Sequence, residues 1–390
     1  MSVIQEVQHM RQQVWQEYIT AMNEDTARKR EWKKKELVYN DVVMRFRMTV
    51  KGFPGPDGYP VYIALHGGGF GITPDVNNQQ WNHMGVYYLD GIKNGIYISP
   101  RGIRDTWNTH FNEESYPLYD RMIADVIAYE NADPNRIYIL GFSAGGDGVY
   151  GIAPRMADRF AAANMSAGHP NDICMENMYR LPIQLQVGAL DHFYGRNKMT
   201  PTYGKYLDEL QKQYGGFEHN VFVHWQKPHN FRDNHPEFEE QTVYADPVAW
   251  LEKGDETTTS ADTNAISFLN RYTRNPVPER VIWNLSVRAG LREIQSFYWL
   301  SMAGEVQEGR IIASYDRKTN LITLEEVFAS GLLTIYVNED MVDFDRPVAV
   351  KYGKETACYS LAPERSVLEA TTWERGDASF QFSSKIEIEL

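Results

Sequence analysis

The chain has 390 residues, of which 39 are lysine or arginine and 52 are aspartate or glutamate, giving a formal net charge of −13. This negative charge argues against nucleic acid or an anionic membrane surface as the main partner. The two cysteines, Cys174 and Cys358, provide neither a disulfide framework nor a Cys-x-x-Cys metal pair. No apolar run is long enough to span a bilayer and the start of the chain lacks a secretory signal, so we expect a cytoplasmic protein.

The N-terminal segment is predicted to form one amphipathic helix, because apolar residues between Val3 and Met22 recur at helical spacing. The charged stretch 28–36 is expected to stay in water, so residues 1–36 would form a helix and a charged linker. Residues 42–50 then have the composition of a strand, which ends at the turn-forming residues 52–58.

Short apolar runs, glycine-rich turns and longer amphipathic stretches then alternate along the chain. Helical stretches such as 116–131 and 203–214 fit between most of the runs. This alternation predicts an α/β fold with a mostly parallel sheet covered by helices on both faces. Because such sheets place their chemistry at the carboxyl ends of the strands, the residues directly after each run are the candidates for a site. The runs lie at 61–65, 96–99, 137–140, 161–165, 183–187 and 221–225.

The pattern changes after about residue 276, where short and often alternating runs follow one another without a long helical pattern between them. This predicts a C-terminal all-β, sandwich-like domain over residues 276–390. Pro276 and Pro278 cannot continue the preceding helix, so the first domain is expected to span 1–275. The C-terminal runs lie at 280–285, 297–300, 310–315, 321–324, 333–337, 348–351 and 386–390.

The strongest chemical signal is Gly-Phe-Ser-Ala-Gly at 141–145, directly after one apolar run and directly before a helical stretch. A Gly-x-Ser-x-Gly sequence in this context forms a sharp turn that exposes the serine hydroxyl, and the small flanking residues let neighbouring backbone pass close by. The sequence therefore predicts Ser143 as a nucleophile. The alternative is a glycine-rich turn with an incidental serine.

A second glycine-rich turn, His-Gly-Gly-Gly at 66–69, follows the run at 61–65. Acyl transfer needs backbone N–H groups aimed at the oxygen that becomes negative in the transition state. Gly67, Gly68 and Gly69 are candidates for this oxyanion hole, together with the amide of Ala144 after the nucleophile. The alternative is a tight turn without a catalytic part.

An acid and a base are predicted at the ends of two later strands. Asp191 follows the run at 183–187 and is the candidate acid, although an aspartate there is also a common helix N-cap; Asp172 and Glu176 are the other candidates. The base is expected just beyond the run at 221–225, where His229 lies, and His235 is the second choice. His224 lies within the strand and His219 lies before it, at the wrong end of the sheet.

The sequence predicts no cofactor and no metal. The sequence 146–151 matches Gly-x-Gly-x-x-Gly, but it falls inside the helix that follows Ser143 and not in the turn of a dinucleotide site. No group of histidines, cysteines and acidic residues has the spacing of metal ligands. Aromatic residues near several strand ends are candidates for a substrate pocket, with core packing as the alternative for each: Phe70, Trp107, Phe193 and Tyr194.

These motifs resemble those of the α/β-hydrolase serine esterases: the His-Gly-Gly-Gly turn, Gly-Phe-Ser-Ala-Gly-Gly at the elbow, and an aspartate and a histidine in that order. The similarity is to the polyhydroxybutyrate-depolymerase-like and acetyl/feruloyl esterase branch, some bacterial members of which carry a C-terminal β-domain. Two features differ from the family pattern. The histidine lies in Lys-Pro-His-Asn, without the usual flanking glycine, and the acidic stretch 232–259 resembles an insertion, which is a candidate lid.

The resemblance implies a serine carboxylic-ester hydrolase that uses Ser143, His229 and Asp191 and forms an acyl-enzyme on a short-chain or aromatic acyl ester. A serine peptidase or an acyltransferase with the same three residues is the first alternative. A hydrolase fold retained as a non-catalytic binding module is the second. The expected partner is a small-molecule ester, and the β-domain is expected to pack against the hydrolase or to mediate assembly into a homo-oligomer.

Overall fold

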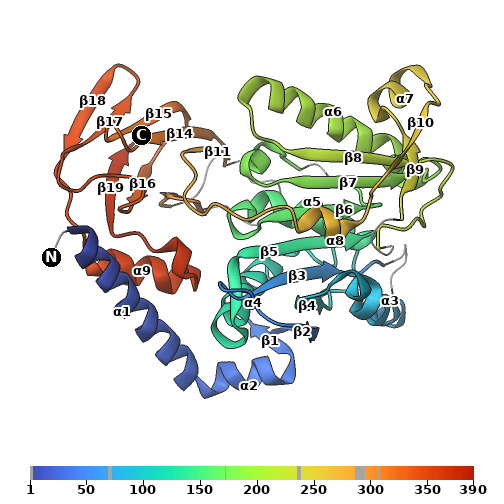
Figure 1. Cartoon of the computed structure of the whole chain (residues 1–390), viewed down its shortest axis with the longest axis horizontal. Coiled ribbons are helices and arrows are strands. Elements are labelled where there is room, and N and C mark those ends of the chain that lie inside the picture. The colour runs from blue at the N-terminus through green and yellow to red at the C-terminus, as the bar shows by residue number, and fades with distance from the viewer. Residues whose placement is uncertain (1–2, 69–72, 172, 235–238, 286–294, 305–307) are drawn as a thin grey trace. The chain divides into compact units, whose positions relative to one another are not determined.

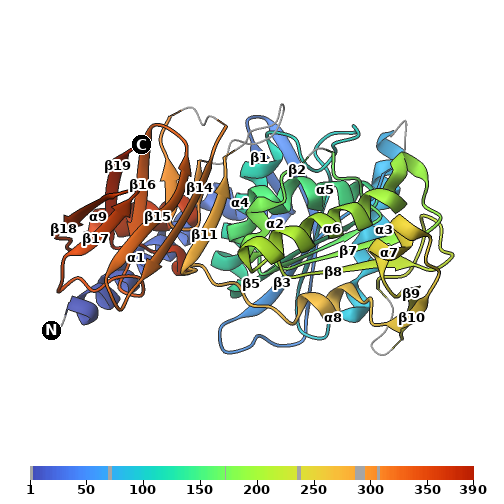
Figure 2. The same ribbon diagram turned by 90° about the horizontal axis from the view of Figure 1, so that it is seen from above.

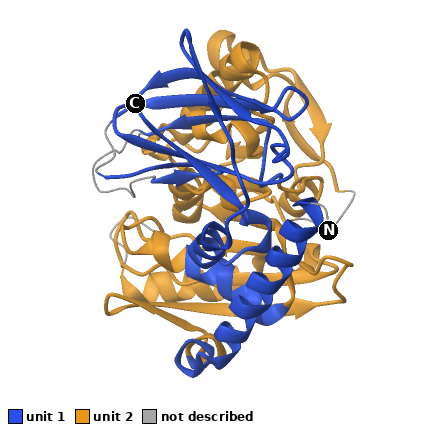
Figure 3. Cartoon of the chain, turned by 90° about the vertical axis from the view of Figure 1, so that its left-hand side faces the viewer, with its two compact units in different colours: residues 1–30, 120–130, 275–390 blue, residues 31–119, 131–274 orange. Residues whose placement is uncertain are grey.

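The computed structural model describes residues 3–68, 73–171, 173–234, 239–285, 295–304 and 308–390. The chain forms two compact units, which Figure 3 colours separately. Unit 1 comprises residues 1–30, 120–130 and 275–390, and unit 2 comprises residues 31–119 and 131–274. The division falls within helices α2 (Thr26–Lys34) and α4 (Ser115–Glu130). In the described part of the chain, no helix combines the length and the apolar character that crossing a membrane requires.

Unit 2 is built on one large sheet (Figure 1). Within the described residues its strand order is β1-β2-β4-β3-β5-β6-β7-β8-β9-β10. The strands from β3 to β8 are parallel, whereas β1, β2, β9 and β10 pair antiparallel with their neighbours. The strands are β1 (Glu36–Tyr39), β2 (Val42–Lys51), β3 (Tyr59–Leu65), β4 (Gly95–Pro100), β5 (Ala132–Phe142), β6 (Ala162–Ser166), β7 (Ile183–Gly188), β8 (His219–His224), β9 (Gln241–Tyr244) and β10 (Thr258–Ala261).

Helices cover both faces of this sheet (Figure 2). On one face, Tyr62, Tyr97 and Tyr138 of the sheet pack in one apolar cluster with Met84 of α3 and Ile266 of α8. On the other face, α5 contacts β5 and β6, and α6 contacts β7 and β8. The helices are α3 (Pro74–Tyr87), α5 (Ala144–Ile152), α6 (Arg196–Tyr214), α7 (Pro247–Lys253) and α8 (Ala265–Leu269), with 3-10 turns η1 (Leu89–Gly91), η2 (Ala153–Arg155), η3 (Ala157–Arg159), η4 (Glu176–Arg180) and η5 (Phe193–Gly195). The predicted fold class, a mostly parallel sheet with helices on both faces followed by a β-rich region, is confirmed.

Two charged segments are more ordered than the sequence analysis expected. The stretch 28–36 is largely helical: α2 buries Trp32, and Arg28 pairs with the buried Asp125, while Lys33 and Lys34 are exposed. The segment 232–259, expected to be an unpatterned insertion, contains β9 and α7, and β10 begins at its end. Trp250 of α7 packs against the cluster around Val187, which ties this segment to the edge of the sheet.

Unit 1 contains two further sheets. Within the described residues their orders are β11-β14-β15-β17-β18 and β12-β13-β16-β19. Trp283 of the first sheet stacks on Phe297 of the second with ring centroids 6.1 Å apart, so the two sheets share a core. The elements are β11 (Arg280–Asn284), β12 (Ser296–Phe297), β13 (Leu300–Met302), β14 (Arg310–Asp316), β15 (Leu321–Phe328), β16 (Leu332–Val337), β17 (Val348–Tyr352), β18 (Glu355–Tyr359), α9 (Arg365–Arg375), η6 (Ala378–Phe380) and β19 (Ser384–Glu389).

The two helices of unit 1 pack against each other. Tyr18 of α1 (Val3–Glu24) lies edge-on to Trp373 of α9, with ring centroids 5.1 Å apart, and Glu17 is paired with Arg365. The sequence analysis assigned α1 to the first domain and predicted no helix near α9. The structure includes α1 in unit 1 because its apolar stripe is covered by α9.

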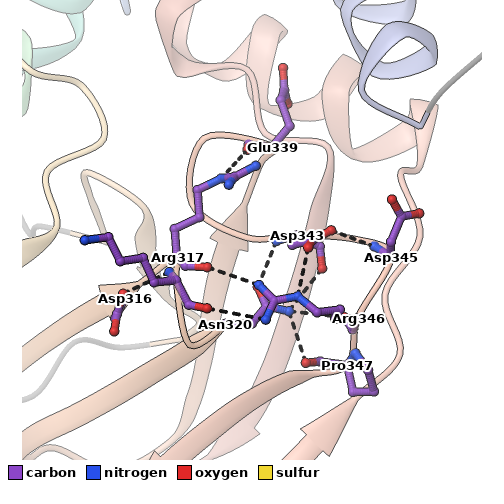
Figure 4. A network of polar contacts seen from close by, with 9 residues as sticks. Asp316, Arg317, Asn320, Glu339, Asp343, Asp345, Arg346 and Pro347 are labelled. Carbon is purple, nitrogen blue, oxygen red and sulfur yellow. Dashed lines mark hydrogen bonds and ion pairs between the residues drawn. The ribbon is translucent and has the colours of Figure 1, made fainter.

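A polar network fixes one end of the sheet β11-β14-β15-β17-β18 (Figure 4). The side-chain amide of Asn320 donates to the carbonyl oxygens of Asp343, Arg346 and Pro347, and its oxygen accepts the N–H of Asp343. The network joins the turn between β14 and β15 to the segment that leads into β17. One buried amide therefore contacts four backbone polar groups of the segment that leads into β17.

Candidate active site

Ser143 occupies a strained turn between β5 and α5. Its backbone has φ 60° and ψ −122°, a conformation that non-glycine residues adopt rarely and that the surrounding structure must hold in place. The N–H of Ser143 donates to the carbonyl of Ser166 at 2.9 Å, and the carbonyl of Ser143 accepts the N–H of Asp147 at 3.0 Å. This geometry is that of a nucleophile elbow, in which the serine hydroxyl projects above the end of the sheet.

The glycines on both sides of Ser143 are required by close backbone contacts. A Cβ atom on Gly141 would lie 2.2 Å from the carbonyl oxygen of Gly145. A Cβ atom on Gly145 would lie 2.0 Å from the carbonyl oxygen of Leu65, at the end of β3. Both positions exclude any side chain, and the second contact also fixes the elbow against the strand that leads into the His-Gly-Gly-Gly turn.

The structure brings Ser143, His229 and Asp191 together from the ends of three strands. His229 Nε2 lies 3.0 Å from the Oγ of Ser143, and His229 Nδ1 lies 2.7 Å from Oδ2 of Asp191. Asp191 is 1% exposed and the His229 side chain is 33% exposed. Because a carboxylate can only accept, Nδ1 carries the ring proton of the neutral imidazole and Nε2 can accept the serine proton. Gly188 and Pro228 hold the two loops close, since a Cβ on Gly188 would lie 2.0 Å from the carbonyl oxygen of Pro228.

The two histidines of β8, the strand that precedes His229, have different partners. His219 Nε2 lies 3.1 Å from Oδ1 of Asp208, and His224 Nε2 lies 2.9 Å from Oε1 of Gln186. His224 is fully buried on the sheet face, as its place within the strand predicted. His235, the second choice for the base, lies outside the residues that the structure describes.

The structure describes one of the two other candidate acids. Glu176 begins the 3-10 turn η4, and Asp172 lies outside the described residues. Among the residues that are described, no group of three or more histidine, cysteine, aspartate or glutamate side chains could hold a metal ion.

The glycine-rich turn passes directly beside the nucleophile. A Cβ on Gly67 would lie 3.3 Å from the Cβ of Ser143, and Gly67 and Gly68 line the same cavity as the serine. Ala144 is the first residue of α5, where backbone N–H groups have no carbonyl partner within the helix. Gly69 lies outside the described residues.

Two buried histidines hold the glycine-rich turn. His66 accepts the N–H of Gly102 at Nε2 (3.0 Å), so its Nδ1–H donates to the carbonyl of Gly67 (2.7 Å). His110 Nε2 lies 2.7 Å from the carbonyl oxygen of His66. Burial lowers the pKa of His66 to about 4 and the pKa of His110 well below its usual value, so both rings are neutral. The turn is therefore fixed by neutral imidazoles with defined donors and acceptors.

A cavity of about 770 Å³ opens beside Ser143 and His229. Among the described residues, the cavity lining does not include Trp107, Phe193 or Tyr194, which are 63%, 76% and 57% exposed; Phe70 lies outside the described residues. Their side chains lie on the surface of loops that leave the strand ends. The lining residues come mainly from the glycine-rich turn, α3 and the loop after β8: Gly67, Gly68, Val76, Gln80, His83, Met84, Val86, Tyr87, Asp90, Phe142, Ser143, His229, Asn230, Phe231, Arg232 and Asn234.

The sequence analysis missed the part that α3 plays in the site. Tyr87, at the end of α3, lines the cavity and donates its hydroxyl to Asp233, which lies four residues after His229. The available signal was the position of α3, which directly follows the glycine-rich turn and so must begin beside the site. No spacing in the sequence singles out Asp233.

The chain is similar in structure to solved esterases. It matches a thermostable esterase at 20% identity and a TM-score of 0.42, over 61% of this chain and 62% of that chain. It matches esterase PE8 at 16% identity and a TM-score of 0.34, over 49% of this chain and 94% of that chain. A feruloyl esterase module from Clostridium thermocellum matches at 13% identity and a TM-score of 0.35, over 50% of this chain and 81% of that chain.

The chain thus spans less than two thirds of the length of the thermostable esterase. No family model matches the chain, and no curated protein matches its sequence.

Proposed function

We propose that the chain is a serine hydrolase of the carboxylesterase type, with Ser143 as nucleophile, His229 as general base and Asp191 as the residue that orients the imidazole. The observation that carries the proposal is the pair of contacts made by His229, which joins the serine hydroxyl at 3.0 Å and the buried carboxylate at 2.7 Å. This chain of contacts is the one that converts an ordinary hydroxyl into a nucleophile.

In the proposed reaction, His229 Nε2 takes the proton of Ser143 as Oγ forms a bond to the carbonyl carbon of an ester. The carbonyl oxygen becomes negative and accepts hydrogen bonds from the amides of Ala144 and the glycine-rich turn. Collapse of this intermediate breaks the bond to the alcohol, which leaves with the proton held by His229. Water then repeats the sequence on the acyl-enzyme, and the carboxylic acid leaves.

The substrate we propose is a small-molecule ester with a short-chain or aromatic acyl group. The cavity supports a ligand of this size, since pockets for small molecules measure about 300–1,000 Å³. Phe142, Phe231 and Met84 offer apolar contact, whereas Asn230 and Gln80 offer hydrogen bonds. The peptidase alternative is tested by the peptide amide in the substrate panel.

The test combines active-site labelling with a substrate panel. The purified chain is treated with a fluorophosphonate and is assayed with acetyl, butyryl and feruloyl esters and with a peptide amide. We expect labelling at Ser143 and turnover of esters above the peptide amide, with a loss of about 10⁶-fold in kcat for Ser143→Ala. Full activity of Ser143→Ala would exclude the proposed nucleophile, and faster turnover of the peptide amide would favour the peptidase alternative.

A further inference from the structure

A buried carboxylate lies in the histidine loop, four residues after His229. Asp233 is completely buried, and its carboxylate accepts three hydroxyl groups. Tyr87 donates to Oδ1 at 2.9 Å, whereas Tyr88 and Ser166 donate to Oδ2 at 2.6 and 2.5 Å. Tyrosines at the end of α3 and a serine at the end of β6 thus meet on one side chain of the loop that carries the imidazole.

This arrangement has little freedom to move. Burial raises the pKa of Asp233, and the three hydroxyl donors oppose that shift because they stabilise the ionised form. A buried carboxylate is stable only while its hydrogen bonds are kept, so any displacement of the loop must break contacts that water cannot replace. The backbone of Asp233 is held as well, since its carbonyl accepts the N–H of Ala265 at 2.8 Å.

Ser166 connects this carboxylate to the nucleophile. Its hydroxyl donates to Asp233, and its backbone carbonyl accepts the N–H of Ser143 at 2.9 Å. The hydroxyl also accepts the side-chain amide of Asn164 at 3.1 Å, which fixes it from the other side. A single residue of β6 therefore contacts both the strained turn of the nucleophile and the anchor of the histidine loop.

The residues between Asp233 and His229 transmit this anchoring to the imidazole. Phe231 stacks on His224 with ring centroids 4.2 Å apart, and the ring centroids of Phe231 and Phe142 are 5.1 Å apart. The ring of His229 itself lies edge-on to Phe142 at 5.9 Å. The loop is thus packed on apolar rings near the imidazole and fixed by hydrogen bonds at Asp233.

We propose that Asp233 is a positioning residue that sets the distance between His229 Nε2 and Ser143 Oγ, acting through Ser166 and the two tyrosines. This inference rests on the proposed function, and it assigns no proton transfer to Asp233. Losing the carboxylate would let the histidine loop and the elbow shift separately, and a misplacement of about 1 Å costs about 100-fold in rate.

The test uses variants that keep the shape of the site. Asp233→Asn replaces the acceptor oxygen by a donor, whereas Ser166→Ala and Tyr88→Phe each remove one hydroxyl and leave the fold intact. Asp125→Asn is the matched control, because Asp125 is also fully buried and its carboxylate is paired with Arg28 in unit 1. The readouts are melting temperature, kcat and KM on an ester of the panel, and the low-field proton signal of His229 Nδ1–H, assigned by its loss in His229→Ala.

We expect Asp233→Asn to lower kcat by about 10- to 100-fold and to shift or broaden the low-field signal, with smaller changes of the same kind in Ser166→Ala and Tyr88→Phe. Asp125→Asn should lower the melting temperature without either change. An unchanged kcat and an unchanged signal in folded Tyr88→Phe and Ser166→Ala would overturn the inference. If the wild-type chain neither reacts with fluorophosphonate nor cleaves esters, the proposed function fails, but the low-field signal still tests whether Asp233 positions His229.

Discussion

The nucleophile turn and the histidine loop lie next to each other but are held by different forces. The turn at Ser143 is fixed by backbone, since Gly141 and Gly145 allow contacts that no side chain would permit. The histidine loop is fixed by side chains, above all the hydroxyl groups on Asp233 and the ring contacts of Phe231. Backbone constraints require glycines at fixed spacing, which can be recognised in a sequence, whereas side-chain constraints such as those on Asp233 produce no recognisable spacing.

Among the variants that test this comparison, the largest effect is expected at Asp191, on the histidine side of the site. Asp191→Asn removes the carboxylate that keeps the proton on His229 Nδ1, and we expect kcat to fall by about 10⁴-fold. Asp208→Asn is the control, because Oδ1 of Asp208 also lies near a histidine nitrogen, Nε2 of His219 at 3.1 Å, but the Asp208 side chain is exposed. Steady-state kinetics of both variants measure the difference. A loss below tenfold in Asp191→Asn would show that another group orients the imidazole.

The backbone side of the comparison is tested by Gly145→Ala. The added methyl group would lie 2.0 Å from the carbonyl oxygen of Leu65, so the elbow and the glycine-rich turn must move apart. We expect kcat to fall by about 100-fold or more and the melting temperature to fall with it. Gly55→Ala is the control, since its new methyl group would meet only Gly55's bridge partner Gly58, at 3.5 Å. Wild-type activity in Gly145→Ala would contradict the account of the elbow.

The same contrast between backbone and side-chain constraints explains which parts of the site could be predicted from the sequence. Ser143 and the glycine-rich turn were found because a sharp turn requires glycine at fixed positions. The parallel sheet was found because its buried strands are continuous apolar runs. The cavity wall on α3 was missed, since Gln80, His83 and Tyr87 are ordinary polar residues of a surface helix until the fold places them beside Ser143.

Elements whose stability comes from tertiary packing were also missed. Helix α9 has a mostly polar sequence, and its buried residues, which include Leu368, are covered only in the folded unit, where α9 contacts α1 and β19. The charged helix α2 buries Trp32 and pairs Arg28 with the buried Asp125. The predicted pocket aromatics Trp107 and Phe193 show the opposite error, because position after a strand does not determine whether a side chain turns inward.

The glycine-rich turn has close backbone contacts at Gly67 and is also held by the side chain of His66. The part of its stability that comes from His66 should depend on pH. The pKa of His66 is about 4 in the folded chain, below its usual value near 6.5, so the unfolded chain binds a proton more readily. Its contribution to stability is therefore complete above about pH 6.5 and is lost as the pH falls toward 4, by about 1.4 kcal/mol for each pH unit. Urea unfolding of the wild type and of His66→Asn at pH 7 and pH 5 measures this. An equal dependence on pH in the two proteins would refute it.

The smallest effect on activity, and a clear effect on stability, is expected at Asn320 in unit 1. The segment before β17 is held in part by the side chain of Asn320, whose amide donates to three carbonyl oxygens (Figure 4). Asn320→Ala leaves these carbonyls without that donor and places alanine at φ 56°, which should lower the free energy of unfolding by about 1–3 kcal/mol.

Thr319→Ala, which changes an exposed residue of the same turn, should cost less than about 0.5 kcal/mol. Ester turnover should be unchanged in both variants at temperatures where they are folded, because the contacts of Asn320 are to other residues of unit 1. If Asn320→Ala unfolds as the wild type does, the shared carbonyl contacts contribute little. Side-chain anchoring would then matter in this chain only where it positions the imidazole.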